Sequence, residues 1–128
     1  MSEGKVFLID DDPVARQLFS RVLEKAGFSV MGTDRVIGTT SMINEFAPDI
    51  ILLDVMMPAL SGDKMVKILR QAIRSGPTII LVSNKSEDEL RKLKEESGAD
   101  DFITKIGGPN LLLRKVNEHI YRKKEGNA

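Results

Sequence analysis

The sequence contains no cysteine, no long apolar run and no excess of charge of either sign. Without cysteine the chain can form neither disulfides nor thiol-based catalytic sites, and an oxidising compartment is not indicated. No apolar segment approaches the ~18 residues of a membrane span, and residues 1–5 lack the apolar core of a signal peptide. We therefore expect a cytoplasmic location and no membrane insertion.

The charges balance, because 19 lysine and arginine residues oppose 19 aspartate and glutamate residues. Proteins that bind nucleic acid or anionic membranes over a broad surface usually carry a clear excess of basic residues. Direct contact with nucleic acid is therefore not expected. The partners of this chain should be other proteins.

The length of 128 residues corresponds to about one domain by the usual prior of ~100 to 200 residues. Hydrophobic residues at 41% and charged residues at 30% are ordinary values for a globular protein, so neither a disordered nor a fibrous class is indicated. We expect one domain over residues 1–124, with no room for a separate effector domain. Residues 125–128 should form a frayed tail.

Five short apolar segments recur along the chain at the length of β-strands. Each is continuous rather than alternating, which is typical of strands buried on both faces of a parallel sheet. Longer segments between them show the spacing of amphipathic helices. The expected strands are residues 6–9, 28–31, 50–53, 79–82 and 102–103.

Helices are predicted over residues 13–26, 62–75, 86–97 and 110–123, with a weaker one over 35–46 that should be short or irregular. The first should turn a stripe containing Val14, Leu18 and Leu23 toward the core, and the third opens with Ser86 and Glu89 at capping-box spacing. Strands alternating with helices predict an α/β fold. Its parallel sheet should have helices on both faces and right-handed crossovers.

Polar side chains follow several of these strands. Asp10, Asp11 and Asp12 come after the first, Asp54 ends the third, Ser83 follows the fourth and Lys105 closes the last. The carboxyl ends of parallel strands share one edge of the sheet, so these groups should converge there. Asp12 before Pro13 is best explained as a helix N-cap. The remaining carboxylates, in a chain with one histidine, indicate an oxygen-liganded Mg²⁺ beside a phosphate.

These segments resemble the four signatures of the CheY-like receiver family of response regulators, in the family's order and over nearly the whole chain. The resemblance implies a flavodoxin-like, doubly wound (βα)5 fold in three α/β/α layers, with strand order 2-1-3-4-5. The matching segments are VFLIDDDP at 6–13, ILLDVMMP at 51–58, ILVS at 80–83 and DFITK at 101–105.

The resemblance also implies the roles of individual residues. Asp54 would accept a phosphoryl group from a sensor histidine kinase, a phosphotransfer protein or a small phosphodonor. Asp11 would bind Mg²⁺ directly, Asp10 through water, and Met56 through its backbone carbonyl. Ser83 and Lys105 would contact the phosphoryl oxygens, and the rotamer of Phe102 would follow the switch. The domain would promote only its own phosphorylation and dephosphorylation, and would signal to a downstream output protein or effector domain.

The sequence departs from the family pattern at two places. Asn84 follows Ser83 where a small residue is usual, and Ile106-Gly107-Gly108 follows Lys105 where a proline is usual. Because a cis bond before a non-proline residue costs about 2.5–4 kcal/mol, we expect a trans Lys105–Ile106 bond. The two glycines predict a longer and softer connection into the last helix, with Pro109 restarting it.

The residues leave two alternatives open. The chain could be a pseudo-receiver that binds proteins and never takes phosphate, which Asn84 and the segment after Lys105 favour. Alternatively, a strand followed by Asp10-x-Asp12-x-Val14 resembles the nucleophile loop of haloacid-dehalogenase phosphatases. That family also needs a lysine before a late acidic pair, whereas here Asp100-Asp101 precedes Lys105 and Asp54 is left without a role. His119 is expected at the surface or its boundary.

Overall fold

A parallel five-stranded sheet forms the centre of the computed structural model, which describes residues 2–58 and 60–126. Its strands lie in the order β2-β1-β3-β4-β5, and every neighbouring pair is parallel. Both the parallel sheet and the expected strand order are confirmed. The strands are β1 (Lys5–Ile9), β2 (Ser29–Thr33), β3 (Ile50–Asp54), β4 (Thr78–Ser83) and β5 (Asp101–Thr104).

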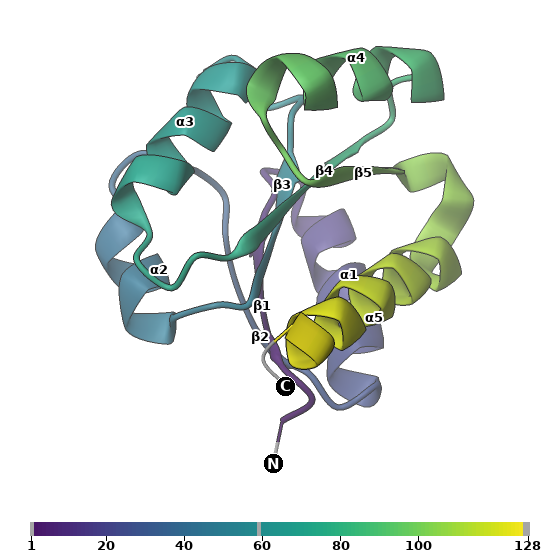
Figure 1. Ribbon diagram of the computed structural model, residues 1–128. Helices are drawn as coiled ribbons and strands as arrows, with labels where there is room; N and C mark the ends of the chain where they lie inside the picture. The colour runs from purple at the N-terminus through teal and green to yellow at the C-terminus, as the bar shows by residue number, and fades with distance from the viewer. Residues whose placement is uncertain (1, 59, 127–128) are drawn as a thin grey trace.

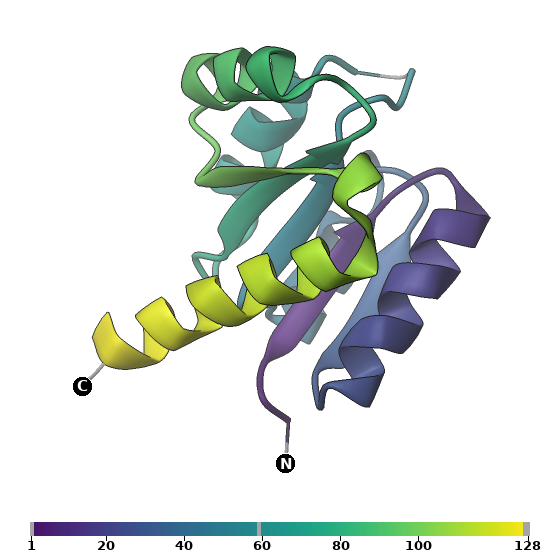
Figure 2. The same cartoon turned by 90° about the vertical axis from the view of Figure 1, so that its right-hand side faces the viewer.

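Helices cover both faces of the sheet and give the expected three layers (Figures 1 and 2). Helices α1 and α5 lie on one face, and α2, α3 and α4 lie on the other. A short 3-10 helix, η1, joins β5 to α5. The helices are α1 (Pro13–Lys25), α2 (Thr40–Phe46), α3 (Gly62–Ala72), α4 (Glu87–Ser97), η1 (Lys105–Gly107) and α5 (Gly108–Gly126).

The core consists of two apolar clusters, one on each face of the sheet. Successive side chains of a strand point to opposite faces, so Phe7 and Ile9 of β1 join the cluster under α2–α4. Val6 and Leu8 join the cluster under α1 and α5. The central strands are apolar on both sides for this reason, and β2, at the edge, is only partly buried.

Helices α1 and α3 differ from expectation, α1 in the face that it buries and α3 in its length. In α1, Val14 and Leu18 are exposed, because Phe19 and Leu23, one turn apart, make the buried contact with the sheet. Helix α3 ends at Ala72 rather than at residue 75, because the backbone of the next residue, Ile73, is extended. Helix α2 is short, as expected, and α4 buries only Leu90.

Helix α5 is longer than predicted, because it begins at Gly108 and continues through Gly126. The frayed tail expected at residues 125–128 stays a prediction, since residues 127–128 lie outside the described part of the chain. Within the described residues, no helix has both the length and the apolar character needed to cross a membrane.

Candidate functional site

Three carboxylates meet at the carboxyl edge of the two central strands. Asp10 and Asp11 follow β1, Asp54 is the last residue of β3, and these strands are neighbours in the sheet. One ligand oxygen from each of the three lies within 4.8 Å of the others. Asp10 and Asp54 are buried, whereas Asp11 is exposed, so the cluster is open to solvent on one side.

Asp54 is held in place from within its own turn. The backbone N–H of Met56 donates to Asp54 Oδ1 at 2.9 Å, which fixes the carboxylate while Met56 itself stays exposed. Burial raises the pKa of Asp54 to about 6; the neighbouring Asp10 acts in the same direction, and the Met56 hydrogen bond and Lys105 act against it. The group is therefore a buried carboxylate that responds strongly to any cation beside it.

Lys105 supplies the positive charge next to this cluster. Its Nζ lies 2.9 Å from Asp10 Oδ2 and 3.4 Å from Asp54 Oδ2, so one ammonium bridges two carboxylates. Burial alone would lower the pKa of Lys105, but the hydrogen bond to Asp10 and the charges of both aspartates raise it. The ammonium is therefore fully protonated at neutral pH.

The junction after Lys105 is shorter than expected. The described residues contain no cis peptide bond, so the expected trans Lys105–Ile106 bond is confirmed. The prediction of a longer, softer connection is wrong: Lys105 opens η1, and α5 begins directly at Gly108. Gly108 turns the chain with a φ of 75°, and Pro109 lies in the first turn of α5. Gly107 has no Cβ, which leaves room for the Leu111 side chain.

Ser83 and Phe102 are the two predicted switch residues. Among the described residues, no hydrogen bond or ion pair joins either side chain to the three carboxylates. Ser83 is fully buried at the end of β4, and its Oγ accepts a hydrogen bond from the Lys85 N–H at 3.1 Å. Phe102 is half-buried on β5 and packs against the core cluster under α2–α4. The guanidinium of Arg91, on α4, lies 5.7 Å from the Phe102 ring centroid. Asn84 is exposed.

Asp12 has the capping role predicted for it. Its Oδ1 accepts the Val14 N–H at 3.0 Å, and its extended backbone precedes the first turn of α1. Its own N–H donates to Asp10 Oδ1 at 2.9 Å, so the cap also orients the buried carboxylate. An oxygen committed to a helix cap is poorly placed to exchange a proton with a substrate, as the second aspartate of that loop would have to do, which weighs against the haloacid-dehalogenase alternative.

Two features near the site were not predicted. Arg16 donates from α1 to the backbone carbonyl of Asp10, and its stem lies over Gly32, where a Cβ would come within 3.1 Å of it. The helical spacing of α1 gave no signal for this contact. His119 is buried rather than at the surface, and its Nε2 lies 2.8 Å from Asp101 Oδ2. Burial acts to raise the pKa of Asp101, but His119, the Phe102 N–H and Lys115 hold it below its ordinary value.

The three clustered carboxylates fit Mg²⁺ by their chemistry. They offer only oxygen ligands, and two of them are buried close together with one lysine between them. A hard divalent cation prefers such a set, whereas Zn²⁺ prefers nitrogen and sulfur ligands. Asp11, Asp54 and the Met56 carbonyl are the residues that would hold it, with Asp10 contributing through water.

Comparison with known sequences gives one consistent result. The family model of the response regulator receiver domain matches residues 6–117. The chain is 32% identical over 119 residues to the phosphate regulon transcriptional regulatory protein PhoB of Klebsiella pneumoniae. It is 31% identical over 125 residues to the DNA-binding response regulator MtrA of Mycolicibacterium smegmatis. These matches cover 92% and 94% of this chain but 52% of each relative, so the chain spans about half their length.

Comparison with solved structures agrees. The BeF3-activated N-terminal receiver domain of Klebsiella pneumoniae RstA superposes with a TM-score of 0.79 at 29% sequence identity. That match covers 91% of this chain and 97% of the other. The fold and the order of strands therefore have close counterparts among solved proteins.

Proposed function

The chain belongs to the response regulator receiver domain family of two-component signalling, and from this premise we propose that Asp54 accepts a phosphoryl group in a Mg²⁺-dependent reaction. The observation that carries the proposal is the bridge made by Lys105 between Asp10 and Asp54 beside Asp11. A buried carboxylate with a cation on one side and further carboxylates on the other is suited to attack a phosphorus atom.

In the proposed step, an oxygen of Asp54 forms a bond to phosphorus as the bond between phosphorus and the donor breaks. With a phosphohistidine donor, the bonding electrons pass to the leaving imidazole nitrogen. Such transfers require little from the protein beyond alignment and neutralisation of charge on the phosphoryl oxygens. Bound Mg²⁺ would supply part of that neutralisation. Lys105 supplies the rest from its position 3.4 Å from the nucleophile.

The chain's own residues keep the nucleophile ready. The Met56 N–H orients one Asp54 oxygen, and Lys105 lies beside the other. The elevated pKa of Asp54 shows how strongly its environment disfavours an isolated negative charge. A cation at the three carboxylates would lower that pKa, so metal binding and ionisation of the nucleophile should occur together.

The same proposal covers regulation and partners. The domain would catalyse only its own phosphorylation and dephosphorylation, and the switch would be read by a downstream output protein or effector domain. The donor would be a sensor histidine kinase or a phosphotransfer protein, in the cytoplasm. Three exposed apolar side chains, Val14, Leu18 and Ile106, lie on segments that follow β1 and β5 at the carboxyl edge of the sheet, where a donor protein must approach.

The deciding experiment is incubation with acetyl phosphate and Mg²⁺, followed by intact-mass measurement. We expect a mass gain of one phosphoryl group that requires both Mg²⁺ and Asp54. A chain that binds Mg²⁺ but is never labelled, by this donor or by a phosphohistidine protein, would instead favour the pseudo-receiver alternative.

A further inference from the structure

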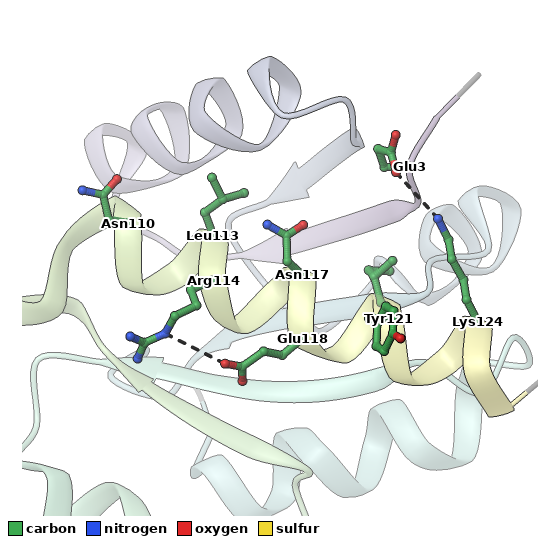
Figure 3. A pocket seen from close by; sticks show the side chains of 9 residues that line it. Glu3, Asn110, Leu113, Arg114, Asn117, Glu118, Tyr121 and Lys124 are labelled. Atoms are coloured by element: carbon green, nitrogen blue, oxygen red, sulfur yellow. Dashed lines mark ion pairs between the residues drawn. The ribbon is translucent and has the colours of Figure 1, made fainter.

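A groove lies beside each of α1 and α5, the helices that cover one face of the sheet. In the groove along α5, Arg114 lies 3.9 Å from Glu118 (Figure 3). Lys124 lies 3.6 Å from Glu3 there, so the charged groups of this groove already have partners. The groove along α1, with a volume of about 340 Å³, is different, because its other wall is the outer edge of β2.

Strand β2 is paired on one side only. Among the described residues its neighbour in the sheet is β1, and the two strands are parallel. The Ser29 N–H donates to a carbonyl just before β1 at 2.9 Å, and the Thr33 carbonyl accepts an N–H just after β1 at 3.1 Å. Because the direction of the backbone groups alternates along a strand, Val30 and Gly32 turn their N–H and C=O groups away from β1. These groups form the free edge of the sheet.

The free edge lacks the side chains that usually prevent pairing with another strand. Natural edges are blunted by charged residues, by proline or by bulges. Residues 26–33 contain no charged residue and no proline, and the ladder with β1 is continuous from Ser29 to Thr33. Met31, in the middle of β2, is 39% exposed, and Gly32 is exposed as well. Strand β5, at the opposite edge, instead carries the charged Asp101.

A second β2 strand fits this edge in the antiparallel direction. With Met31 on a two-fold axis, Val30 lies opposite Gly32 of the second copy, and Gly32 lies opposite Val30 of the second copy. These are the residues whose backbone groups face outward, so each opposed pair can exchange both N–H···O=C hydrogen bonds. An axis on Val30 or on Gly32 would pair the outward groups of that residue alone. The register centred on Met31 is therefore the most favourable one.

The side chains suit the same register. Val30 packs on the cluster under α1 and α5, so Met31 points to the other face of the sheet. There the two Met31 side chains meet in a non-hydrogen-bonded pair, whose Cα atoms lie about 4.5 Å apart. On the α1 face, Gly32 leaves room for Val30 of the second copy. The α1 wall of the groove is uncharged except for Arg16, which donates to the Asp10 carbonyl, so an identical wall meets little repulsion.

We propose that the free edge of β2 binds β2 of a second copy of this chain, antiparallel about Met31, so that the two sheets become continuous. A pair of five-residue strands buries less area than a standard interface of about 1,600 Å². The contact should therefore be weak and reversible. It uses none of the three clustered carboxylates, so Asp54→Asn should associate like the wild type whether or not the proposed phosphorylation occurs.

Two oppositely charged variants on the axis test the contact. Met31→Lys and Met31→Glu each place like charges opposite each other, so each alone should weaken self-association at least about tenfold. Mixing the two variants places opposite charges there and should restore a dimer with one copy of each. Sedimentation velocity up to about 1 mM protein measures the association, and circular dichroism checks the folding of each variant. Gln71→Lys, exposed on α3, is the matched control and should associate like the wild type.

A disulfide tests the register independently. The chain has no cysteine, so Met31→Cys introduces a single thiol that meets its own copy across the axis. The expected Cα separation of about 4.5 Å lies within the ~4.4 to 6.8 Å that a disulfide spans. In air with a copper catalyst, Met31→Cys should form covalent dimers much faster than Gln71→Cys, whose thiol lies away from β2.

Three outcomes would overturn the proposal. The first is a wild-type chain that stays monomeric up to about 1 mM. The second is a dimer that neither charged variant of Met31 weakens, or that the mixture does not restore, because the contact would then lie on another surface. The third is cross-linking of Met31→Cys no faster than that of Gln71→Cys.

Discussion

Lys105 lies 3.4 Å from Asp54, although 51 residues separate them in the chain. The contact exists because β3 and β5 both end at the same edge of the sheet, on either side of β4. The lysine opens a 3-10 turn that leads without a loop into α5. Chemistry at the acidic cluster is therefore connected to the start of the last helix by a single side chain.

Asp54→Asn and Asp54→Ala should abolish labelling by acetyl phosphate while the protein stays folded. The carboxylate is the only group at the end of β3 that can form the new bond, and the amide of asparagine is not a nucleophile. Intact-mass measurement after incubation with Mg²⁺ checks this. Asp12→Asn is the matched control, because asparagine keeps the cap on α1 and labelling should persist. Labelling of both Asp54 variants would reject the assignment.

Neutralising Asp54 should also stabilise the protein when no metal is present. The pKa of Asp54 is raised to about 6 from an unfolded value near 3.8, so the folded state binds this proton more tightly than the unfolded state does. Its contribution to stability is present below pH ~4 and is lost as the pH rises to ~6. Two pKa units correspond to at most about 3 kcal/mol.

We therefore expect the free energy of unfolding of Asp54→Asn to exceed that of the wild type by about 1–3 kcal/mol at pH 7.5 in the presence of a chelator. The difference should shrink toward zero below pH ~4. Urea denaturation at both pH values measures it. An equal gain at both pH values would mean that the effect is not electrostatic.

Asp11→Ala should lower the affinity for Mg²⁺ at least about tenfold and remove metal-dependent labelling. Asp11 is exposed, so its loss leaves the core unchanged, and the buried pair Asp10 and Asp54 keeps its bridge to Lys105. Isothermal titration measures the affinity, again with Asp12→Asn as the control. Unchanged Mg²⁺ binding in Asp11→Ala would show that the metal lies elsewhere.

The pattern of apolar residues was enough to predict the sheet. Continuous apolar segments such as Ile50–Leu53, when amphipathic helices separate them, indicate strands buried on both faces of a parallel sheet. The convergence of Asp10, Asp54 and Lys105 followed from the same topology. The orientation of α1 and the burial of His119 did not, because each depends on a tertiary contact. Leu18 and Leu23 are equally apolar in sequence, yet only Leu23 meets the sheet. His119 is buried because Asp101, on the neighbouring strand, accepts its hydrogen bond.

Phosphorylation should move Ser83 toward Asp54 and thereby free the Lys85 amide. In the structure, the Ser83 hydroxyl accepts the Lys85 N–H at 3.1 Å, and a hydroxyl that turns to a phosphoryl oxygen gives up that acceptor geometry. Hydrogen exchange of residues 83–90, with and without the phosphoryl analogue BeF3⁻, measures the change. In Ser83→Ala, the Lys85 amide should exchange fast both with and without the analogue, because its acceptor is missing. Identical exchange in the wild type with and without the analogue would argue against a switch at this position.

Gly107→Ala should loosen the junction that positions Lys105. A Cβ at Gly107 would lie 2.2 Å from Leu111 Cδ2 and 3.0 Å from Leu111 Cβ, so the side chain, and then the helix, must shift. Such overpacking costs about 1–3 kcal/mol, and a displaced Lys105 should slow labelling of Asp54. Urea denaturation and the rate of mass gain measure the two effects.

Leu111→Ala combined with Gly107→Ala removes the 2.2 Å clash with Cδ2 and leaves only the 3.0 Å approach to the Cβ of residue 111, so it should restore most of the labelling rate that Gly107→Ala loses. Gly126→Ala, at the end of α5 with no atom within 4 Å of the added Cβ, is the control and should change neither quantity. Were labelling by Gly107→Ala as fast as that of the wild type despite lower stability, the junction would stabilise the fold without positioning the lysine. A slow double variant would instead assign the effect to the backbone of residue 107 and its close approach to the Cβ of residue 111, because the clash with the Leu111 methyl group would then be gone.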